Sequence, residues 1–182
     1  DPDTSNTFTY TLVSGTGSTD NSYFSISGNQ LQIAALMDYD VQPTYSILVR
    51  STDQGGLYFE KTFTITATNV NESPFNLLLS NSSVAEYSAI GTAVGTLSTW
   101  DPDAGDSFTY ALVTGTGSDD NALFTIVGNE LKTATVFDYD TRSVYSVRVQ
   151  VTDSGNLTYE DTFYVNIVNV NEAPFAILLS YN

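Results

Sequence analysis

The sequence predicts an all-β chain of two tandem Greek-key β-sandwiches, and two observations carry this prediction. Apolar and polar residues alternate with period two, as they do in half-buried strands. In addition, most of the first part of the chain recurs 100 positions later, and that length suits a small β-sandwich with its own core. No segment shows a sustained helical period. Short strands separated by turns favour a Greek-key sandwich over alternating strand and helix units.

The alternation is cleanest in residues 145–152, where Tyr145 and three valines point to one face and polar residues to the other. This pattern is typical of a strand with one buried face. Glycine-rich segments at 14–18 and 53–56 mark turns, because glycine tolerates a positive φ. The same alternation predicts further strands at 8–12, 45–50, 108–112 and 163–167.

Three acidic or amide-rich motifs occur twice at the same offset: Asp-Pro-Asp at 1–3 and 101–103, Asp-Tyr-Asp at 38–40 and 138–140, and Asn-Val-Asn-Glu at 69–72 and 169–172. The last motif precedes a proline, which cannot donate to a sheet ladder, so it marks the junction between repeats. We therefore expect three segments: a repeat at 1–73 that lacks its opening strand, a complete repeat at 74–172, and the opening strand of a following repeat at 173–182.

Composition limits the function classes. Five Lys and Arg face 21 Asp and Glu, and the net charge of −16 argues against nucleic acid and anionic membranes as partners and leaves cations as natural ones. No apolar run is long enough to insert this segment into a membrane. The chain has no Cys and no His, which removes disulfides, a thiol nucleophile and the usual catalytic base. This composition fits a secreted or surface protein stabilised by metal.

The repeated acidic motifs predict a calcium site. In a sandwich, the Asp-Tyr-Asp motif and the junction lie at one end of a unit, and the Asp-Pro-Asp motif and a turn aspartate lie at the near end of the next. So many carboxylates repel one another unless a hard cation neutralises them, and calcium takes six to eight oxygen ligands. The expected ligands between the units are Asp38, Asp40, Asn69, Asn71, Glu72, Asp101, Asp103 and Asp153.

The repeats resemble cadherin repeats, in the divergent form found in large bacterial surface proteins, over essentially the whole chain. Residues 84–92 resemble the family's Pro-Glu-Asn stretch, and the resemblance implies that Glu86 is a bridging calcium ligand. Residues 137–140 resemble its Leu-Asp-Arg-Glu motif, which implies Asp138 and Asp140 as ligands. The resemblance implies an extracellular adhesion or spacer module, rigidified by calcium. Its partners would be proteins, either copies of itself or others.

Two departures from the family pattern bear on affinity. Asn69 and Asn169 stand where the family linker usually begins with Asp, and Asp140 stands where the family has Glu. Both changes weaken the ligand set. The first repeat also lacks a counterpart of Glu86, so we expect an incomplete site with affinity at or below the roughly 10⁻⁴ to 10⁻³ M of extracellular calcium modules.

Residues 175–180 repeat 75–80 and are too apolar to remain in water. An exposed sheet edge recruits strands, so these residues predict strand donation to the first repeat of another copy. Such donation would form a second calcium site from two molecules. Its ligands would be Glu86, Asp138, Asp140, Asn169, Asn171 and Glu172 of one copy and Asp1, Asp3 and Asp53 of the other.

Two other function classes compete with the calcium module. Paired carboxylates hydrolyse glycosides in many enzymes, but a catalytic pair need occur only once, whereas this pattern recurs in both repeats. We therefore do not expect an enzyme. A carbohydrate-binding module is the alternative, with Trp100 and Tyr87 as stacking platforms for surface carbohydrate. Asp53 and Asp153 also have an ordinary interpretation as hairpin-turn residues.

Overall fold

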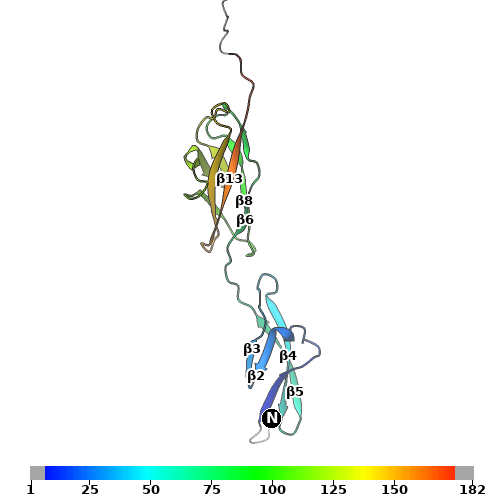
Figure 1. Ribbon diagram of the computed structural model, residues 1–182. Helices are drawn as coiled ribbons and strands as arrows, with labels where there is room; N and C mark the ends of the chain where they lie inside the picture. The colour runs from blue at the N-terminus through cyan, green and yellow to red at the C-terminus, as the bar shows by residue number, and fades with distance from the viewer. Residues whose placement is uncertain (1–6, 175–182) are drawn as a thin grey trace, which may run out of the picture. The chain divides into compact units, whose positions relative to one another are not determined.

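The structure is a computed structural model that describes residues 7–174 (Figure 1). It forms two compact units, the first ending at Val70 and the second beginning at Asn71. Within the described residues, the regular elements are strands apart from two three-residue 3-10 turns. The all-β prediction is therefore confirmed.

The second unit is a sandwich of two four-stranded sheets. One sheet has the order β10-β11-β8-β6 and the other the order β7-β13-β12-β9. Its elements are β6 (Phe75–Leu79), β7 (Ser83–Ala85), β8 (Ala93–Trp100), β9 (Thr109–Leu112), η2 (Asn121–Leu123), β10 (Phe124–Val127), β11 (Glu130–Thr133), β12 (Val144–Thr152) and β13 (Thr158–Val168).

The core of the second unit lies between these sheets. Along β12 the alternation predicted from the sequence is confirmed, because Tyr145 and the valines at 147, 149 and 151 are buried. Leu97 of β8 and Leu131 of β11 pack into the same apolar cluster from the other sheet. β-branched residues fit the pleated, half-buried surface of β12, which pairs with β13 along its whole length.

One strand pair departs from expectation. The predicted Greek-key sandwich is built from antiparallel strands, but β7 runs parallel to β13, with Val84 opposite Ile167. Both of these side chains are buried. The short β7 therefore serves to close the edge of the β13 sheet over the core.

The first unit has fewer strands among its described residues. A three-stranded sheet has the order β1-β4-β5, and β2 pairs with β3 alone. Its elements are β1 (Phe8–Leu12), η1 (Asn21–Tyr23), β2 (Phe24–Ser27), β3 (Gln30–Ile33), β4 (Thr44–Asp53) and β5 (Tyr58–Thr66).

These elements correspond to β9 through β13 of the second unit. Residues 7–70 contain no counterparts of β6, β7 and β8. The sequence analysis had predicted that only one opening strand was missing from the first repeat. Phe24, Tyr45 and Ile47 still form a small buried cluster. The expected segment boundaries at 73 and 173 stay predictions.

A repeated turn supports both units. Gly17 and Gly117 have φ values of +90° and +84°, which L side chains rarely adopt. A Cβ at Gly117 would also lie 2.4 Å from Cγ2 of Thr162. Glycine is therefore required at this turn by both its backbone conformation and its close approach to the neighbouring strand.

Candidate metal centre

Four aspartates form an acidic cluster in the second unit: Asp101, Asp103, Asp106 and Asp153. Asp101 directly follows β8, and Asp103 and Asp106 lie in the loop that leads to β9. Asp153 directly follows β12, in the turn before β13. The two sheets thus deliver carboxylates from separate stretches of sequence to one place.

Local hydrogen bonds hold the cluster. Asp101 Oδ1 accepts the backbone N–H of Asp103 at 3.0 Å, which folds Asp-Pro-Asp into an Asx turn. Asp153 Oδ1 accepts the backbone N–H of Leu157 at 2.8 Å and so closes the β12–β13 turn. Ser154 Oγ donates to Asp106 Oδ1. The ordinary turn role of Asp153 is therefore real, and it uses only one of the two carboxylate oxygens.

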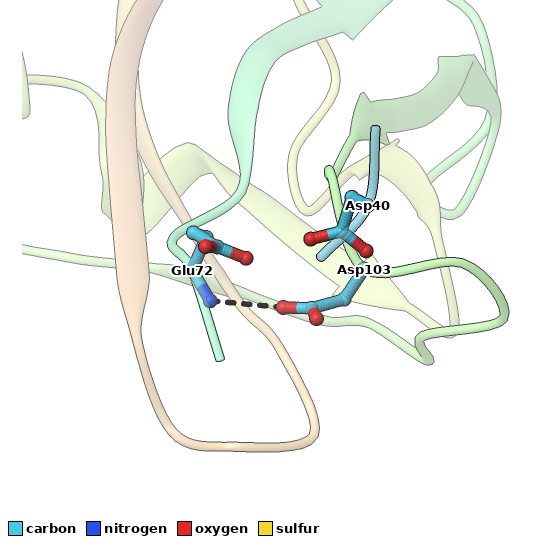
Figure 2. A group of neighbouring side chains, drawn as sticks. All are labelled: Asp40, Glu72 and Asp103. Carbon is cyan, nitrogen blue, oxygen red and sulfur yellow. Dashed lines mark hydrogen bonds between the residues drawn. The ribbon is translucent and has the colours of Figure 1, made fainter. Parts of the chain in front are cut away.

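The junction segment packs against this cluster. The backbone N–H of Glu72 donates to Asp103 Oδ2 at 2.9 Å (Figure 2). Asn71 Nδ2 donates to Asp153 Oδ2 at 3.0 Å. A Cβ at Gly155 would lie 2.3 Å from Cγ of Asn71, so only glycine leaves room for that side chain. The predicted ligands Asn71, Glu72, Asp101, Asp103 and Asp153 are thus brought together within the second unit.

The electrostatics of the acidic cluster favour a cation. One carboxylate oxygen from each of Asp101, Asp106 and Asp153 lies within 4.8 Å of the others. Oδ2 of Asp101 and Oδ2 of Asp106 are buried and have no hydrogen-bond partner among the described residues. Burial raises the pKa of Asp101, the Asp103 N–H opposes this, and the charges of Asp106, Asp103 and Asp153 add to the rise. Buried acceptors without a partner are costly unless something else satisfies them.

The chemistry of the donor set indicates which cation fits. All the candidate donors are hard oxygens, and there is no His or Cys in the chain to provide the nitrogen or sulfur ligands of zinc. Calcium accepts carboxylates, amide oxygens and water in flexible geometry, whereas magnesium demands a near-ideal octahedron. The residues present therefore fit calcium.

The opposite end of the second unit holds the other acidic motifs. Glu86 is only 3% exposed, and both of its oxygens accept backbone hydrogen bonds. Oε2 accepts the N–H of Tyr139 and Oε1 that of Val170, each at 2.7 Å. The carboxylate of Glu86 therefore ties the Asp-Tyr-Asp loop to the segment after β13.

The neighbouring residues complete this second acidic group. Asp138 Oδ1 accepts the N–H of Asp140 at 2.9 Å, in the same Asx turn that Asp101 forms. The Tyr87 hydroxyl hydrogen-bonds to Glu172, and this bond, together with burial and nearby carboxylates, raises the pKa of Tyr87. Asn169 and Asn171 lie in the same exposed segment after β13. Asp140 joins the group through its backbone N–H, whereas its carboxylate and the side chains of Asn169 and Asn171 make no hydrogen bond to the group within residues 7–174.

The remaining predicted ligands belong elsewhere. Asp38, Asp40 and Asn69 are in the first unit, where Asp38 Oδ1 accepts the Asp40 N–H at 3.0 Å. Asp53 Oδ1 accepts the N–H groups of Gly55 and Leu57 at 2.8 and 2.9 Å, as a hairpin-turn residue does. Asp1, Asp3 and the tail at 175–180 lie outside the described residues.

Asp106 was not among the ligands predicted from the sequence. Its counterpart 100 positions earlier is Asn6, so the search for repeated acids passed over it. The available signal was local: Asp106 is the third acid within six residues of Asp101 in a glycine-containing loop.

Comparisons with known proteins point to one family. The chain is 28% identical to human cadherin-related family member 2 over 199 residues, spanning all of this chain and 15% of that protein. It is 31% identical to mouse protocadherin Fat 2 over 153 residues, spanning 79% of this chain and 4% of that protein. The chain thus covers only a small part of the relatives it matches. No family model matches it.

Solved structures show the same fold. The protocadherin PcdhgB3 EC1-4 structure matches with a TM-score of 0.70 at 21% identity, over 90% of this chain and 41% of that one. Human protocadherin-24 EC1-2 matches with a TM-score of 0.69 at 15% identity, over 90% and 82%. Within residues 7–174 no helix has the length and apolar character needed to cross a membrane. From its sequence relatives and its fold together, the chain consists of cadherin repeats, which are extracellular domains of cell-adhesion proteins.

Proposed function

We propose that this chain is a calcium-binding, calcium-rigidified adhesion or spacer module of a cadherin repeat array. The observation that carries the proposal is the acidic cluster, in which two buried carboxylate oxygens have no hydrogen-bond partner among the described residues. Calcium would supply the missing positive charge and would take these oxygens as ligands.

The ligand set follows from the contacts within the second unit. Asp101, Asp106 and Asp153 offer oxygens that are already close together, and Asp103 is joined to them through the Asp101 turn. Asn71 and Glu72 are held beside the cluster by their hydrogen bonds to Asp153 and Asp103. The participation of Asp38, Asp40 and Asn69 of the first unit stays a prediction from the sequence.

A second calcium site is proposed at the other end of the second unit. Glu86, Asp138, Asp140, Asn169, Asn171 and Glu172 would provide its ligands from this chain. Because both Glu86 oxygens already accept backbone hydrogen bonds, we expect this site to be weaker than the acidic cluster when no other unit completes it.

Calcium would act mechanically and not catalytically. Units joined by a short linker swing relative to one another unless an interface or ligand restrains them. A cation that binds the junction residues Asn71 and Glu72 would restrain the linker at its attachment to the second unit. The module would then hold adhesive repeats apart, with protein partners that include copies of itself.

Thermal unfolding in calcium and in chelator tests the proposal. With a dissociation constant near 10⁻⁴ M, about 10 mM calcium is roughly 100 times that constant and stabilises the native state by about 2.7 kcal/mol. Because each kcal/mol raises the midpoint of a unit of this size by about 4–8 °C, the midpoint should rise by about 10–20 °C. Magnesium at the same concentration serves as the control and should give a much smaller rise. Identical midpoints in calcium and chelator would contradict the proposal.

The carbohydrate-binding alternative gains no support. Trp100 is 65% exposed, but it lies at the end of β8 and pairs with Phe75. Tyr87 follows β7, which pairs with the C-terminal end of β13, whereas Trp100 precedes the acidic cluster beside the start of β13. The 11 residues of β13 span roughly 35 Å, so the two rings do not form one stacking platform.

A further inference from the structure

Glu86 and Tyr87 directly follow the short strand β7, and their backbone groups bind two segments that are far from them in sequence. The N–H of Glu86 donates to the carbonyl oxygen of Val168, the last residue of β13, at 3.0 Å. The N–H of Tyr87 donates to the carbonyl oxygen of Phe137 at 2.9 Å. The chain after β7 is therefore bonded both to the end of β13 and to the residue before the Asp-Tyr-Asp loop.

The side chain of Glu86 repeats this pattern. Its two oxygens accept the N–H groups of Tyr139 and Val170, each at 2.7 Å, so the carboxylate binds the same two segments as the backbone. Glu86 is buried, whereas Val170 is 45% exposed and lies beyond the last residue of β13, where no strand ladder holds it among the described residues. Hydrogen bonds to a carboxylate are stronger than those between neutral groups. A buried charge therefore holds a segment that would otherwise be bound only by water.

The backbone of Tyr87 is strained. Its φ of +57° is a left-handed conformation that bulky L residues rarely adopt. Such strain persists only where the surrounding structure determines the backbone, and it is frequent at functional sites. The turn at Tyr87 lets Glu86 stay buried while the Tyr87 N–H reaches Phe137. The four hydrogen bonds around residues 86 and 87 account for a strained residue at this position.

We propose that Glu86 and Tyr87 form a metal-independent clasp, which fixes the segment after β13 to the second unit when no calcium is bound. The two ends of this unit would then differ. At the acidic cluster, buried oxygens of Asp101 and Asp106 have no hydrogen-bond partner among the described residues, so a cation would stabilise that end. At the clasp, the protein itself satisfies both carboxylate oxygens. The proposal concerns the calcium-free chain and does not depend on the proposed function.

The clasp gives Glu86 a role besides that of a calcium ligand. It holds the Asp-Tyr-Asp loop and the segment after β13 side by side before any ion arrives. A cation that binds there would not have to order the segment, and preorganisation of this kind lowers the cost of binding.

Hydrogen exchange followed by NMR on the whole chain in chelator tests the proposal. In the wild type, the amides of Tyr139 and Val170 should be protected without calcium. Glu86→Gln leaves one acceptor oxygen where there were two, so at least one of these amides should exchange about tenfold faster, the factor that corresponds to about 1.4 kcal/mol. Asp140→Asn is the matched control. It removes the same charge from a carboxylate that makes no hydrogen bond to the clasp within residues 7–174, so both amides should stay protected.

A second measurement uses only the wild type and so covers the case in which Glu86→Gln unfolds the unit. Scalar couplings across the hydrogen bonds, from the amide nitrogens of Tyr139 and Val170 to the carboxyl carbon of Glu86, detect the clasp directly. We expect both couplings in chelator.

Two results would overturn the proposal. One is exchange at both amides that Glu86→Gln leaves unchanged in chelator, because Glu86 would then act only as a ligand. The other is protection or coupling that is absent in chelator and appears only with calcium, because the clasp would then need the metal. A chain that binds no calcium at all could still show the clasp, so failure of the calcium proposal and failure of the clasp are distinguishable.

Discussion

At the scale of single residues, Asp101 carries much of the electrostatic cost of the acidic cluster. One of its oxygens accepts the Asp103 N–H, and the other is buried without a hydrogen-bond partner among residues 7–174. Burial and the neighbouring carboxylates raise its pKa. This charge therefore lowers the stability of the folded second unit when no cation is bound.

Asp101→Asn should relieve that cost. The amide oxygen keeps the Asx turn, and the charge is lost. In chelator we expect the variant to be more stable than the wild type by about 1 kcal/mol, the low end of the cost of an unpaired buried polar group. In calcium the order should reverse. Asp161→Asn, a change of the same charge at an exposed position on β13, is the control and should alter neither condition. Chemical denaturation with and without calcium measures both effects.

The pH dependence follows from the direction of the Asp101 pKa shift. Because the folded pKa lies above the unfolded one, the folded state binds more protons between the two values. The contribution of Asp101 to the free energy of unfolding is therefore fully present below the unfolded pKa and is lost as pH rises through the folded pKa. In chelator, the stability advantage of Asp101→Asn should be largest at neutral pH and should shrink on acidification below the folded pKa. An advantage that is constant or grows towards acid would refute this assignment.

Residue types at repeated positions were predictable, and their individual contacts were not. Asp101, Asp103 and Asp153 stood out because each motif recurs or has a turn neighbour. Asp106 did not, because its role depends on a loop conformation and on Ser154, 48 residues away. Burial of one carboxylate oxygen while the other caps a turn is a property of packing that no sequence pattern reports.

At the scale of elements, an ion pair fixes the loop before β12. Arg142 donates to both oxygens of Asp120 at 2.7 Å, and Asp120 Oδ2 also accepts the N–H of Ser146 at 2.8 Å. Asp120 is buried, so its charge depends on these donors. In the first unit the same position is Gln42, which donates to Asp20 at 3.0 Å.

Arg142→Ala should lower the unfolding midpoint of the second unit, because it removes two hydrogen bonds to the buried carboxylate of Asp120. Arg142→Gln copies the first unit's arrangement and should lower the midpoint only roughly half as much. Differential scanning calorimetry on both variants checks the comparison. Equal losses would mean that the arginine acts through its packing over the Tyr145 ring and not through Asp120.

The strands were largely predictable because one buried face imposes period two. β1 and β12 fall where the alternation placed them, whereas β13 begins five residues before the predicted strand at 163–167. The parallel pairing of β7 with β13 was not predictable, since a three-residue strand has too few residues to show a period. The division of residues 75–100 into three strands was missed because its turns contain few of the usual turn glycines.

At the scale of the whole molecule, we expect calcium to restrain the linker. Small-angle scattering should give a larger maximum dimension and a narrower distribution of distances in calcium than in chelator, because a restrained linker samples fewer bent arrangements. Asp103→Ala should give the chelator profile in both conditions while each unit stays folded. Superimposable profiles for the wild type would contradict calcium rigidification.

The tandem organisation was predictable because the 100-residue offset is visible without any structure. Strand donation by residues 175–180 remains a prediction, since these residues lie outside the described part of the chain. The structure adds a constraint on it. In the second unit β6 pairs with β8 and not with β11, so a strand with the sequence of β6 would pair with a strand at the β8 position and not with β3 itself.

Calcium titration by isothermal calorimetry, on the wild type and on the double variant Asp101→Asn, Asp106→Asn, tests the central claim most directly. The two substitutions remove the charge of the two buried oxygens without a hydrogen-bond partner among the described residues, and leave the size of both side chains unchanged. We expect saturable binding by the wild type with a dissociation constant of about 10⁻⁴ to 10⁻³ M. The double variant, still folded by circular dichroism, should lose this binding. Equal calcium binding by the two proteins, or none by the wild type, would contradict that claim.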